Sequence, residues 1–173
     1  LYDGGLRVPT FAWGHSICSP GRRSDTPITS ADLFPTIIEV AGISALKDQP
    51  LDGTSLVAEF EGRRLPIRDL FWHFPCYIGR GSPSSAIRRG NHKLIQWFEN
   101  ERVELFDLSQ DPGESRNIAR ANPKTAAVLL SNLKAWQVRT GALLPGGENP
   151  DYDPAARNRS GSRNDRSKGK RGR

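Results

Sequence analysis

The chain has 173 residues and a formal net charge of +6, with 36% hydrophobic and 25% charged residues. This length suits one ordinary domain, or the end of one domain and a small second one. No apolar run approaches the roughly 20 residues that a transmembrane helix needs, which argues against a membrane-spanning segment. The chain has no Met and begins with Leu1, so we expect a fragment of a longer protein.

The positive charge is concentrated at the C-terminus. Residues 156–173 contain eight basic residues and one acidic residue, so the first 155 residues carry a net charge close to −1. The segment has no aromatic or large aliphatic side chain and cannot bury enough surface to offset the entropy of ordering. We therefore predict a disordered basic tail over residues 155–173, which either solubilises the terminus or contacts phosphates or another polyanion.

The first third of the chain has the pattern of a strand followed by a helix. Val8–Trp13 is an apolar run of the length and type of a buried strand. A helix is predicted after a loop, with Asp32 as N-cap, Pro35 in the first turn and Gly42 at the end. The apolar residues on one face of this helix are Leu33, Ile37, Val40 and Ala41.

A weakly patterned connector, with at most a short helix at Ser55–Phe60, leads into an antiparallel sheet. Asp69–Tyr77 is aromatic-rich and predicted to be a strand that stops at Pro75, because proline cannot donate to a central ladder. Tight turns at Gly90-Asn91 and at residues 99–101 then separate apolar runs, a pattern typical of hairpins. The three runs predicted as strands of this meander are Ser84–Arg88, Lys93–Phe98 and Val103–Leu108.

The last predicted element is a helix that starts at Asn122-Pro123, with Pro at the first helical position, and ends at Gly141. Its expected apolar stripe consists of Ala126, Leu130, Leu133, Ala135 and Trp136. A helix across one face of a small antiparallel sheet buries the apolar sides of both. The C-terminal part is therefore predicted to be α+β.

Six segments resemble, in this order and spacing, the C-terminal part of the sulfatase family. They are Tyr2–Pro9 (YDGGLRVP), Thr29–Gly42 (TSADLFPTIIEVAG), Leu51–Leu56 (LDGTSL), Phe71–Pro75 (FWHFP), Ser85–Ile95 (SAIRRGNHKLI) and Glu104–Ala119 (ELFDLSQDPGESRNIA). Each segment alone is a weak signal, and together they are a strong one. The resemblance covers Leu1–Pro154 and leaves only the basic tail outside it.

This resemblance implies an α/β fold with an α+β C-terminal part. Residues 1–45 would be the end of a large alkaline-phosphatase-like α/β domain, and residues 46–68 a connector. Residues 69–154 would then form the C-terminal subdomain, a small antiparallel sheet packed against a C-terminal helix. Residues 155–173 are the predicted tail.

The resemblance also implies an activity. Sulfatases are sulfuric ester hydrolases whose nucleophile is a formylglycine made from the Cys or Ser of a C/S-x-P-x-R motif, and a calcium ion polarises the sulfate. In the family these groups lie upstream of the segment that matches Tyr2, so this fragment alone is expected to lack catalytic residues, bind no calcium and be inactive. The implied substrate is a sulfated carbohydrate. A periplasmic or secreted location is expected for the full-length protein.

Cys18-Ser19-Pro20-Gly21-Arg22 matches the C-x-P-x-R motif literally. In the family, however, the nucleophile motif begins a helix far upstream, and here the match is followed by residues that fit an ordinary loop. A pattern with three fixed positions arises easily by chance. We therefore predict that Cys18 is not the nucleophile, and that Cys18 and Cys76 are free thiols.

His73 is the one residue that the resemblance assigns to substrate binding. In many sulfatases the corresponding stretch reads close to F-W-H-Y-P-H-Y and faces the active-site cleft, where an imidazole can donate a hydrogen bond to a sugar hydroxyl or leaving-group oxygen. Alternation along the strand leaves a second interpretation open. It places Phe71 and His73 on one face, where His73 would fill a hydrogen-bonded slot between sheet and large domain. Cys76 stands in place of the pattern's second His.

The sequence offers few other candidates for a metal site or for acid–base catalysis. The three His residues lack metal-ligand spacing, and Asp107 and Asp111 lie near a turn, where capping of backbone N–H groups is expected. The alternative function class is a non-enzymatic binding module that uses the basic tail on nucleic acid or another polyanion. Between the two classes, the sequence favours a sulfatase fragment.

Overall fold

A computed structural model describes residues 1–14, 21–43, 48, 50–77 and 81–146. The predictions about Cys18 and about the basic tail fall on other residues and lie outside the described ones. The helices are α1 (Asp3–Leu6), the 3-10 helix η1 (Ser30–Asp32), α2 (Leu33–Val40), α3 (Val57–Phe60) and α4 (Pro123–Thr140). The strands are β1 (Asp69–Phe74), β2 (Ser84–Arg89), β3 (His92–Trp97) and β4 (Val103–Asp107).

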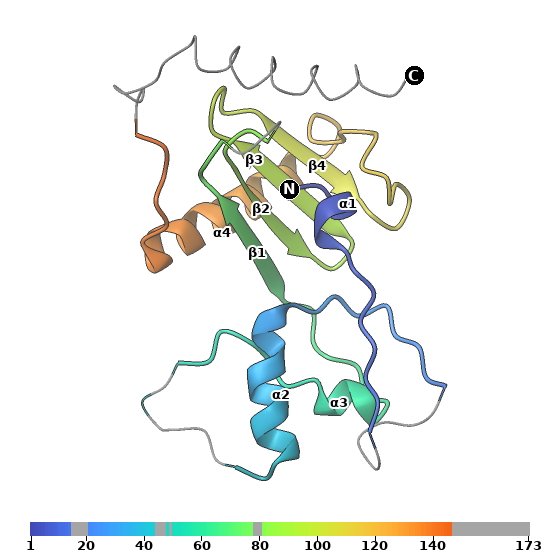
Figure 1. Cartoon of the computed structure of the whole chain (residues 1–173). Coiled ribbons are helices and arrows are strands. Elements are labelled where there is room, and N and C mark those ends of the chain that lie inside the picture. The colour runs from blue at the N-terminus through green and yellow to red at the C-terminus, as the bar shows by residue number, and fades with distance from the viewer. Residues whose placement is uncertain (15–20, 44–47, 49, 78–80, 147–173) are drawn as a thin grey trace, which may run out of the picture.

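The four strands form one antiparallel sheet in the order β1-β2-β3-β4 (Figure 1). Ala86 in the centre of β2 lies opposite Trp72 of β1 and Ile95 of β3. The β2–β3 turn uses Gly90 at a φ of 58°, a conformation that costs glycine little. The predicted strand at Asp69–Tyr77 ends before Pro75. The meander prediction is thus confirmed, with β1 as an additional edge strand.

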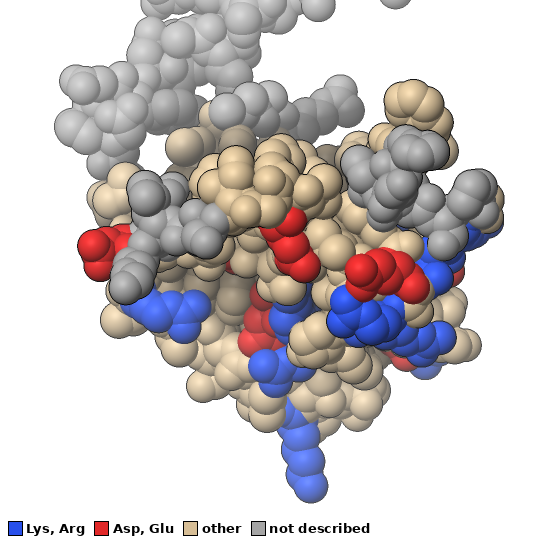
Figure 2. All heavy atoms as spheres, turned by 90° about the horizontal axis from the view of Figure 1, so that it is seen from below, with Lys and Arg blue, Asp and Glu red and all other residues tan. Residues whose placement is uncertain are grey.

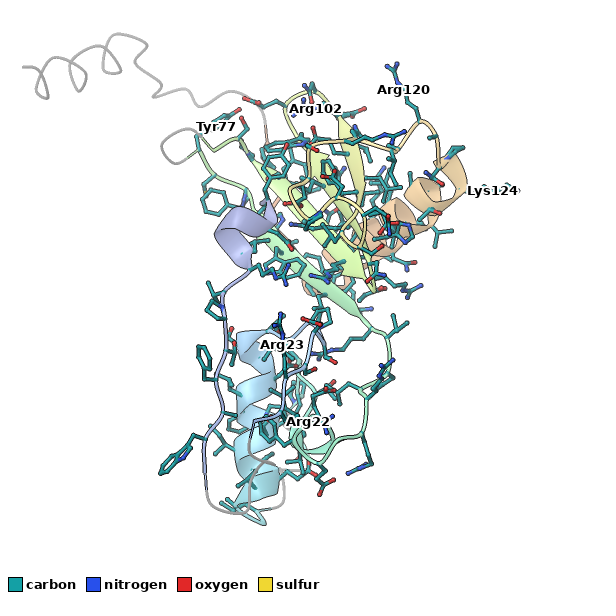
Figure 3. All side chains as sticks on the ribbon, turned by 90° about the vertical axis from the view of Figure 1, so that its right-hand side faces the viewer. Arg22, Arg23, Tyr77, Arg102, Arg120 and Lys124 are labelled. Carbon is teal, nitrogen blue, oxygen red and sulfur yellow. The ribbon has the colours of Figure 1, made fainter. Side chains whose placement is uncertain are left out.

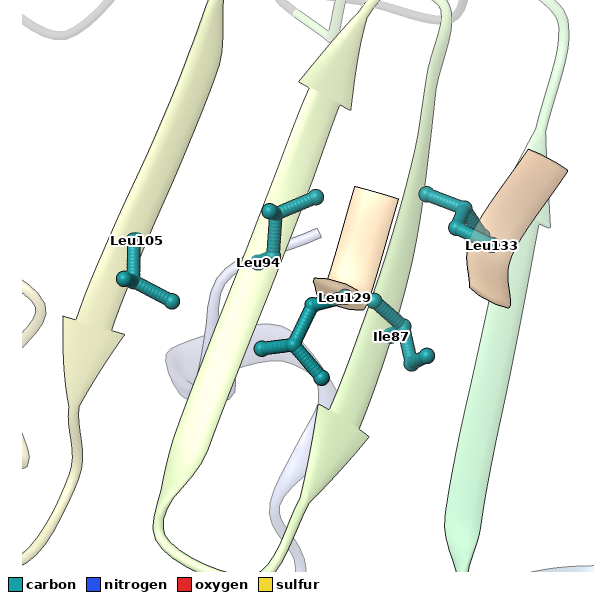
Figure 4. Close-up of a cluster of buried hydrophobic side chains, with 5 residues drawn as sticks. All are labelled: Ile87, Leu94, Leu105, Leu129 and Leu133. Carbon is teal, nitrogen blue, oxygen red and sulfur yellow. The ribbon is translucent and has the colours of Figure 1, made fainter. Parts of the chain in front are cut away.

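Helix α4 covers one face of the sheet (Figure 1). The buried side chains between them are Ile87, Leu94, Leu105, Leu129 and Leu133 (Figure 4). Each such side chain contributes roughly 1.5–3 kcal/mol when it leaves water. The helix begins after Asn122 and is closed by Gly141 at a φ of 62°, as predicted. The predicted stripe was partly wrong, because Leu129 and Gln137 are buried while Leu130 and Trp136 lie at the edge of the contact.

The first residues of the chain cover the opposite face of the sheet. Ala86, Ile95 and Phe106 form a second buried cluster, against which Leu1 packs. The Tyr2 ring lies 6.0 Å from the ring of Phe106 and equally far from that of Trp97. Residues that the sequence assigns to the end of the large domain therefore contact the C-terminal sheet.

The predicted strand at Val8–Trp13 is wrong for this structure. The segment is extended but pairs with no strand in the described part of the chain. Val8, Phe11 and Trp13 are 72%, 91% and 96% exposed. The sequence pattern specifies a strand that is buried on both sides, and such a strand does not form without neighbours to pair with.

Helix α2 has the predicted ends but not the predicted burial. It begins after Asp32 and is closed by Gly42 at a φ of 65°. Leu33, Ile37 and Val40, the expected core face, are 48%, 64% and 47% exposed. The apolar face of α2 thus adds to the exposed apolar surface of Val8–Trp13. Among the described helices, none is long and apolar enough to cross a membrane.

Candidate functional site

His73 lies on the α4 face of β1, as the alternation predicts, and is only partly buried. Its Nδ1 is 2.6 Å from the Ser85 hydroxyl and its Nε2 is 2.8 Å from the Leu143 carbonyl oxygen. The neutral ring that satisfies both partners donates Nε2–H to the carbonyl and accepts the Ser85 proton at Nδ1. The rings of Phe98 and Trp136 meet the imidazole edge-on at 5.9 and 6.3 Å.

These contacts give His73 a structural task in the described chain. Its ring fastens the segment after α4 to β1, and both of its nitrogens are engaged. A substrate hydroxyl could reach Nε2 only by replacing the Leu143 carbonyl. Leu143 is itself exposed, so this replacement would disturb little packing. The substrate role of His73 stays a prediction.

Lys93 is the centre of a buried group of charges that the sequence analysis missed. Its ammonium group is fully buried and lies 2.6 Å from Asp3 Oδ1 and 2.7 Å from Glu114 Oε1. The guanidinium of Arg88 lies 3.6 Å from the other oxygen of Asp3. Glu114 holds its position with a φ of 52°, which is uncommon for a residue with a Cβ. The cluster ties α1 to β3 and to the loop after β4.

The sequence did contain a signal for this cluster. Alternation in β3 places Lys93 on the same face as Ile95 and opposite Leu94, and both faces of this strand carry core residues. A lysine at such a position needs a buried carboxylate partner. Because Asp3 is 90 residues away along the chain, only the tertiary fold identifies the partner.

A second buried charge, Asp32, braces the first half of the chain. Its carboxylate accepts hydrogen bonds from the backbone N–H of Thr29 at 2.8 Å and of Thr54 at 2.9 Å. Both of its oxygens also accept from the guanidinium of Arg68, one of them at 2.6 Å. Burial alone would raise the pKa of Asp32, but the hydrogen bonds from Arg68, Thr29 and Thr54 outweigh burial and lower it. Asp32 therefore caps the turn before α2 rather than α2 itself.

The buried carboxylates do not fit a calcium site. Asp3 and Glu114 are paired with Lys93, Asp3 also lies beside Arg88, and Asp32 is paired with Arg68. A calcium ion would have to compete with those cations for the same oxygens. Within the described ranges, no group of three His, Cys, Asp or Glu side chains could hold a metal ion.

Asp107 and Asp111 have the capping role that the sequence predicts. Asp107 accepts the Ser109 N–H at 3.0 Å, and Asp111 accepts those of Ser115 and Arg116 at 3.1 and 2.8 Å. These bonds lower the pKa of both carboxyl groups, chiefly through the Ser109 hydroxyl at Asp107 and the Arg116 N–H at Asp111. Both carboxylates therefore hold the turns that follow β4.

The described part of the chain contains a cleft of about 650 Å³. Residues 22–27 line one side, and Glu59 and residues from Gly62 to Arg68 line the other. Leu70, Arg88 and Gly90, at the near end of the sheet, complete the lining. Five arginines border this space: Arg22, Arg23, Arg64, Arg68 and Arg88. We call it the arginine cleft.

Residues 1–139 match the family described as "N-sulphoglucosamine sulphohydrolase, C-terminal". The chain belongs to the sulfatase family. The match confirms the resemblance to the C-terminal part of a sulfatase that the six sequence segments indicate. It extends from the first residue to the end of α4 and so includes both the sheet and α2.

Two relatives of the chain are longer sulfatases. It is 32% identical over 159 residues to a sulfatase of Formosa agariphila, a match that covers 82% of this chain and 29% of the relative. It is 35% identical over 127 residues to the choline-sulfatase of Rhizobium meliloti, covering 72% of this chain and 23% of the relative. The chain thus spans less than a third of the length of either relative.

Solved sulfatases share the fold. A structure of a 2-O GAG sulfatase superposes with a TM-score of 0.54 at 27% identity, covering 73% of this chain and 28% of that protein. A sulfatase in complex with its substrate D-glucosamine-2-N,6-O-disulfate superposes with a TM-score of 0.50 at 25% identity, covering 61% of this chain and 23% of that protein. These similarities confirm the predicted fold class, a sulfatase end with a small antiparallel sheet and a C-terminal helix.

Proposed function

We propose that this chain supplies the C-terminal part of a sulfatase that hydrolyses sulfate esters of carbohydrates. The family match over residues 1–139 carries this proposal. Support for a carbohydrate substrate comes from relatives: one is an N-acetylgalactosamine-6-sulfatase of dog, and another is a 2-O GAG sulfatase. The comparisons lend no support to the alternative of a nucleic-acid or polyanion-binding module.

In this proposal the nucleophile and the calcium ion are supplied by residues other than the described ones. The exposed apolar side chains of Val8–Trp13 and of α2 support this assignment of the nucleophile and the calcium ion to other residues. An exposed apolar surface of this kind is suited to packing against further protein. A periplasmic or extracellular location of the whole enzyme stays a prediction.

The 173-residue chain by itself is expected to hydrolyse no aryl sulfate, because a sulfate-attacking group needs its cation and orienting shell in one place. The measurement is release of 4-nitrophenol from its sulfate ester by the purified chain. The Cys18→Ala variant serves as the control for the motif match at Cys18. Hydrolysis by the chain that disappears in Cys18→Ala would show that Cys18 is the nucleophile after all.

Replacing His73 by alanine in the full-length enzyme is expected to lower kcat/KM on the natural substrate about three- to tenfold, the worth of one neutral hydrogen bond. The matched control is Ser85→Ala, which removes the ring's Nδ1 partner but no group that could reach substrate. Melting temperatures of both variants are measured alongside the kinetics. A fall in melting temperature in both variants, with unchanged kcat/KM, would leave His73 only its structural task.

A further inference from the structure

We propose that the arginine cleft is a binding site for a sulfated saccharide unit, with Arg22, Arg23 and Arg64 as the groups that pair with its sulfates. The saccharide class rests on the proposed function, whereas the anion-binding character of the cleft rests on its own charges and shape. The cleft volume of about 650 Å³ lies within the range of roughly 300–1,000 Å³ that small-molecule sites occupy.

The arginines around the cleft are of two kinds: those beside a carboxylate and those for which the described residues show no ion pair. Arg68 is paired with the buried Asp32, and Arg88 lies beside Asp3. No ion pair is found for Arg22, Arg23 or Arg64 among the described residues. These three guanidinium groups are exposed at the rim of the cleft. They are therefore free to bind an anion without breaking an existing bridge.

Acidic groups cancel only part of this positive charge. The two acids in the lining are Asp25 and Glu59, against the three arginines that have no ion pair. The Glu59 carboxylate accepts the Ser24 hydroxyl at 2.6 Å and the Leu65 N–H at 3.4 Å, and the charge of Arg22 acts on it. Figure 2 views the molecule from the α2–α3 end and shows Lys and Arg side chains beside Asp and Glu on this face.

The hydrogen bonds of Glu59 also fix the shape of the cleft. Ser24 belongs to one wall and Leu65 to the other, so the Glu59 carboxylate joins the two walls. The Ser24 bond lowers the pKa of Glu59, so this link stays charged well below neutral pH. A site with walls held in place before binding loses less entropy when ligand enters.

Glycine at position 62 lets Arg22 lie close to the opposite wall. Gly62 has a φ of +96°, and a Cβ added there would stand 2.5 Å from Arg22 Nη1. Arg22 thereby reaches across the cleft, while Arg23 follows it on the same loop (Figure 3). Guanidinium groups suit this task because they bind the oxygens of sulfate-like anions in pairs and keep their charge at all physiological pH values.

The cleft is distinct from the predicted substrate contact at His73. The cleft is lined by Arg68 and Leu70 at the start of β1, and His73 lies near the other end of that strand. Leu70 lies three positions before His73 in β1, or roughly 10 Å away at 3.3 Å per residue. The inferred site and the predicted substrate contact at His73 therefore lie at different places on the molecule.

The test is isothermal titration calorimetry of the full chain with a fully sulfated heparin tetrasaccharide. The variant Arg22→Gln/Arg23→Gln/Arg64→Gln is expected to bind about tenfold more weakly. The charge-matched control is Arg120→Gln/Lys134→Gln/Arg139→Gln, which removes three exposed cations outside the cleft; Figure 3 shows Arg120 at the end of the molecule opposite Arg22 and Arg23. The control is expected to change affinity less than twofold, and the basic residues after Gly146 are the same in both variants.

Equal losses in the two triple variants would overturn the proposal, because they would mean attraction to net charge alone. Equal binding of the same tetrasaccharide after chemical desulfation would overturn it too. Amide chemical shifts of the unsubstituted chain provide a second measurement that needs no variant to fold. Shifts confined to residues 22–27 and 59–68 support the site, and shifts confined to other residues contradict it. Since no step requires turnover, failure of this test is distinguishable from an absence of sulfatase activity.

Discussion

Replacing Lys93 by alanine is expected to lower the free energy of unfolding by about 3–5 kcal/mol, the usual cost of removing one partner of a buried ion pair. The substitution leaves the buried carboxylate of Glu114 without a cation and that of Asp3 with only the guanidinium of Arg88, at 3.6 Å. It also leaves a cavity beneath the sheet, since Lys93 has no exposed surface. The ion pairs that join β3 to α1 and to the loop after β4 are then lost.

Urea unfolding followed by tryptophan fluorescence measures this loss. The matched control is Lys134→Ala, because Lys134 is exposed on α4 and has no ion-pair partner in the described chain. A change within about 0.5 kcal/mol is expected there. A loss below about 1 kcal/mol for Lys93→Ala would contradict the view that this cluster stabilises the fold.

Asp32→Ala is expected to be comparably destabilising, by about 3 kcal/mol or more, because it removes the partner of a half-buried arginine and two backbone acceptor contacts. The N–H groups of Thr29 and Thr54 and the guanidinium of Arg68 lose their acceptor together. These three groups come from the turn before α2, the connector and the entrance to β1. The arrangement of these three segments therefore depends on the carboxylate of Asp32.

The same substitution should change the pH dependence of stability. The pKa of Asp32 in the fold is lower than its ordinary value of 3.8. The carboxylate therefore adds stability above that ordinary value, and this contribution disappears as pH falls through the depressed pKa of the folded state. The stability gap between the unsubstituted chain and Asp32→Ala should be full at pH 6 and should narrow below about pH 4.

Unfolding measured from pH 2.5 to 7 tests this dependence. Asp25→Ala is the control, because Asp25 is an exposed acid seven residues earlier in the chain. It is expected to leave stability nearly unchanged at every pH. A gap for Asp32→Ala of constant size down to pH 2.5 would contradict the charged hydrogen-bond network around Asp32.

Only part of the candidate sites could be predicted from the sequence. His73 could be named from the sequence because it lies in a segment that resembles the family. The alternative placed its ring in a slot between the sheet and the large domain. The contact with Leu143, 70 residues away and after α4, was not foreseen. The arginine cleft was not foreseen at all. Arg22, Arg23 and Arg64 look like ordinary solvated charges until the fold places two loops beside each other.

The sequence by itself determined the strands of the sheet, both ends of α4 and α2, and the membership in the sulfatase family. These features depend on short-range rules: turn glycines with positive φ, prolines that stop strands, and local alternation of apolar residues. Only the tertiary structure decided that Val8–Trp13 forms no strand in the described chain and that the apolar face of α2 is exposed. It also decided the partners of Lys93. The physical reason is that pairing and charge neutralisation join residues far apart in sequence, and no local pattern specifies which distant group will be present.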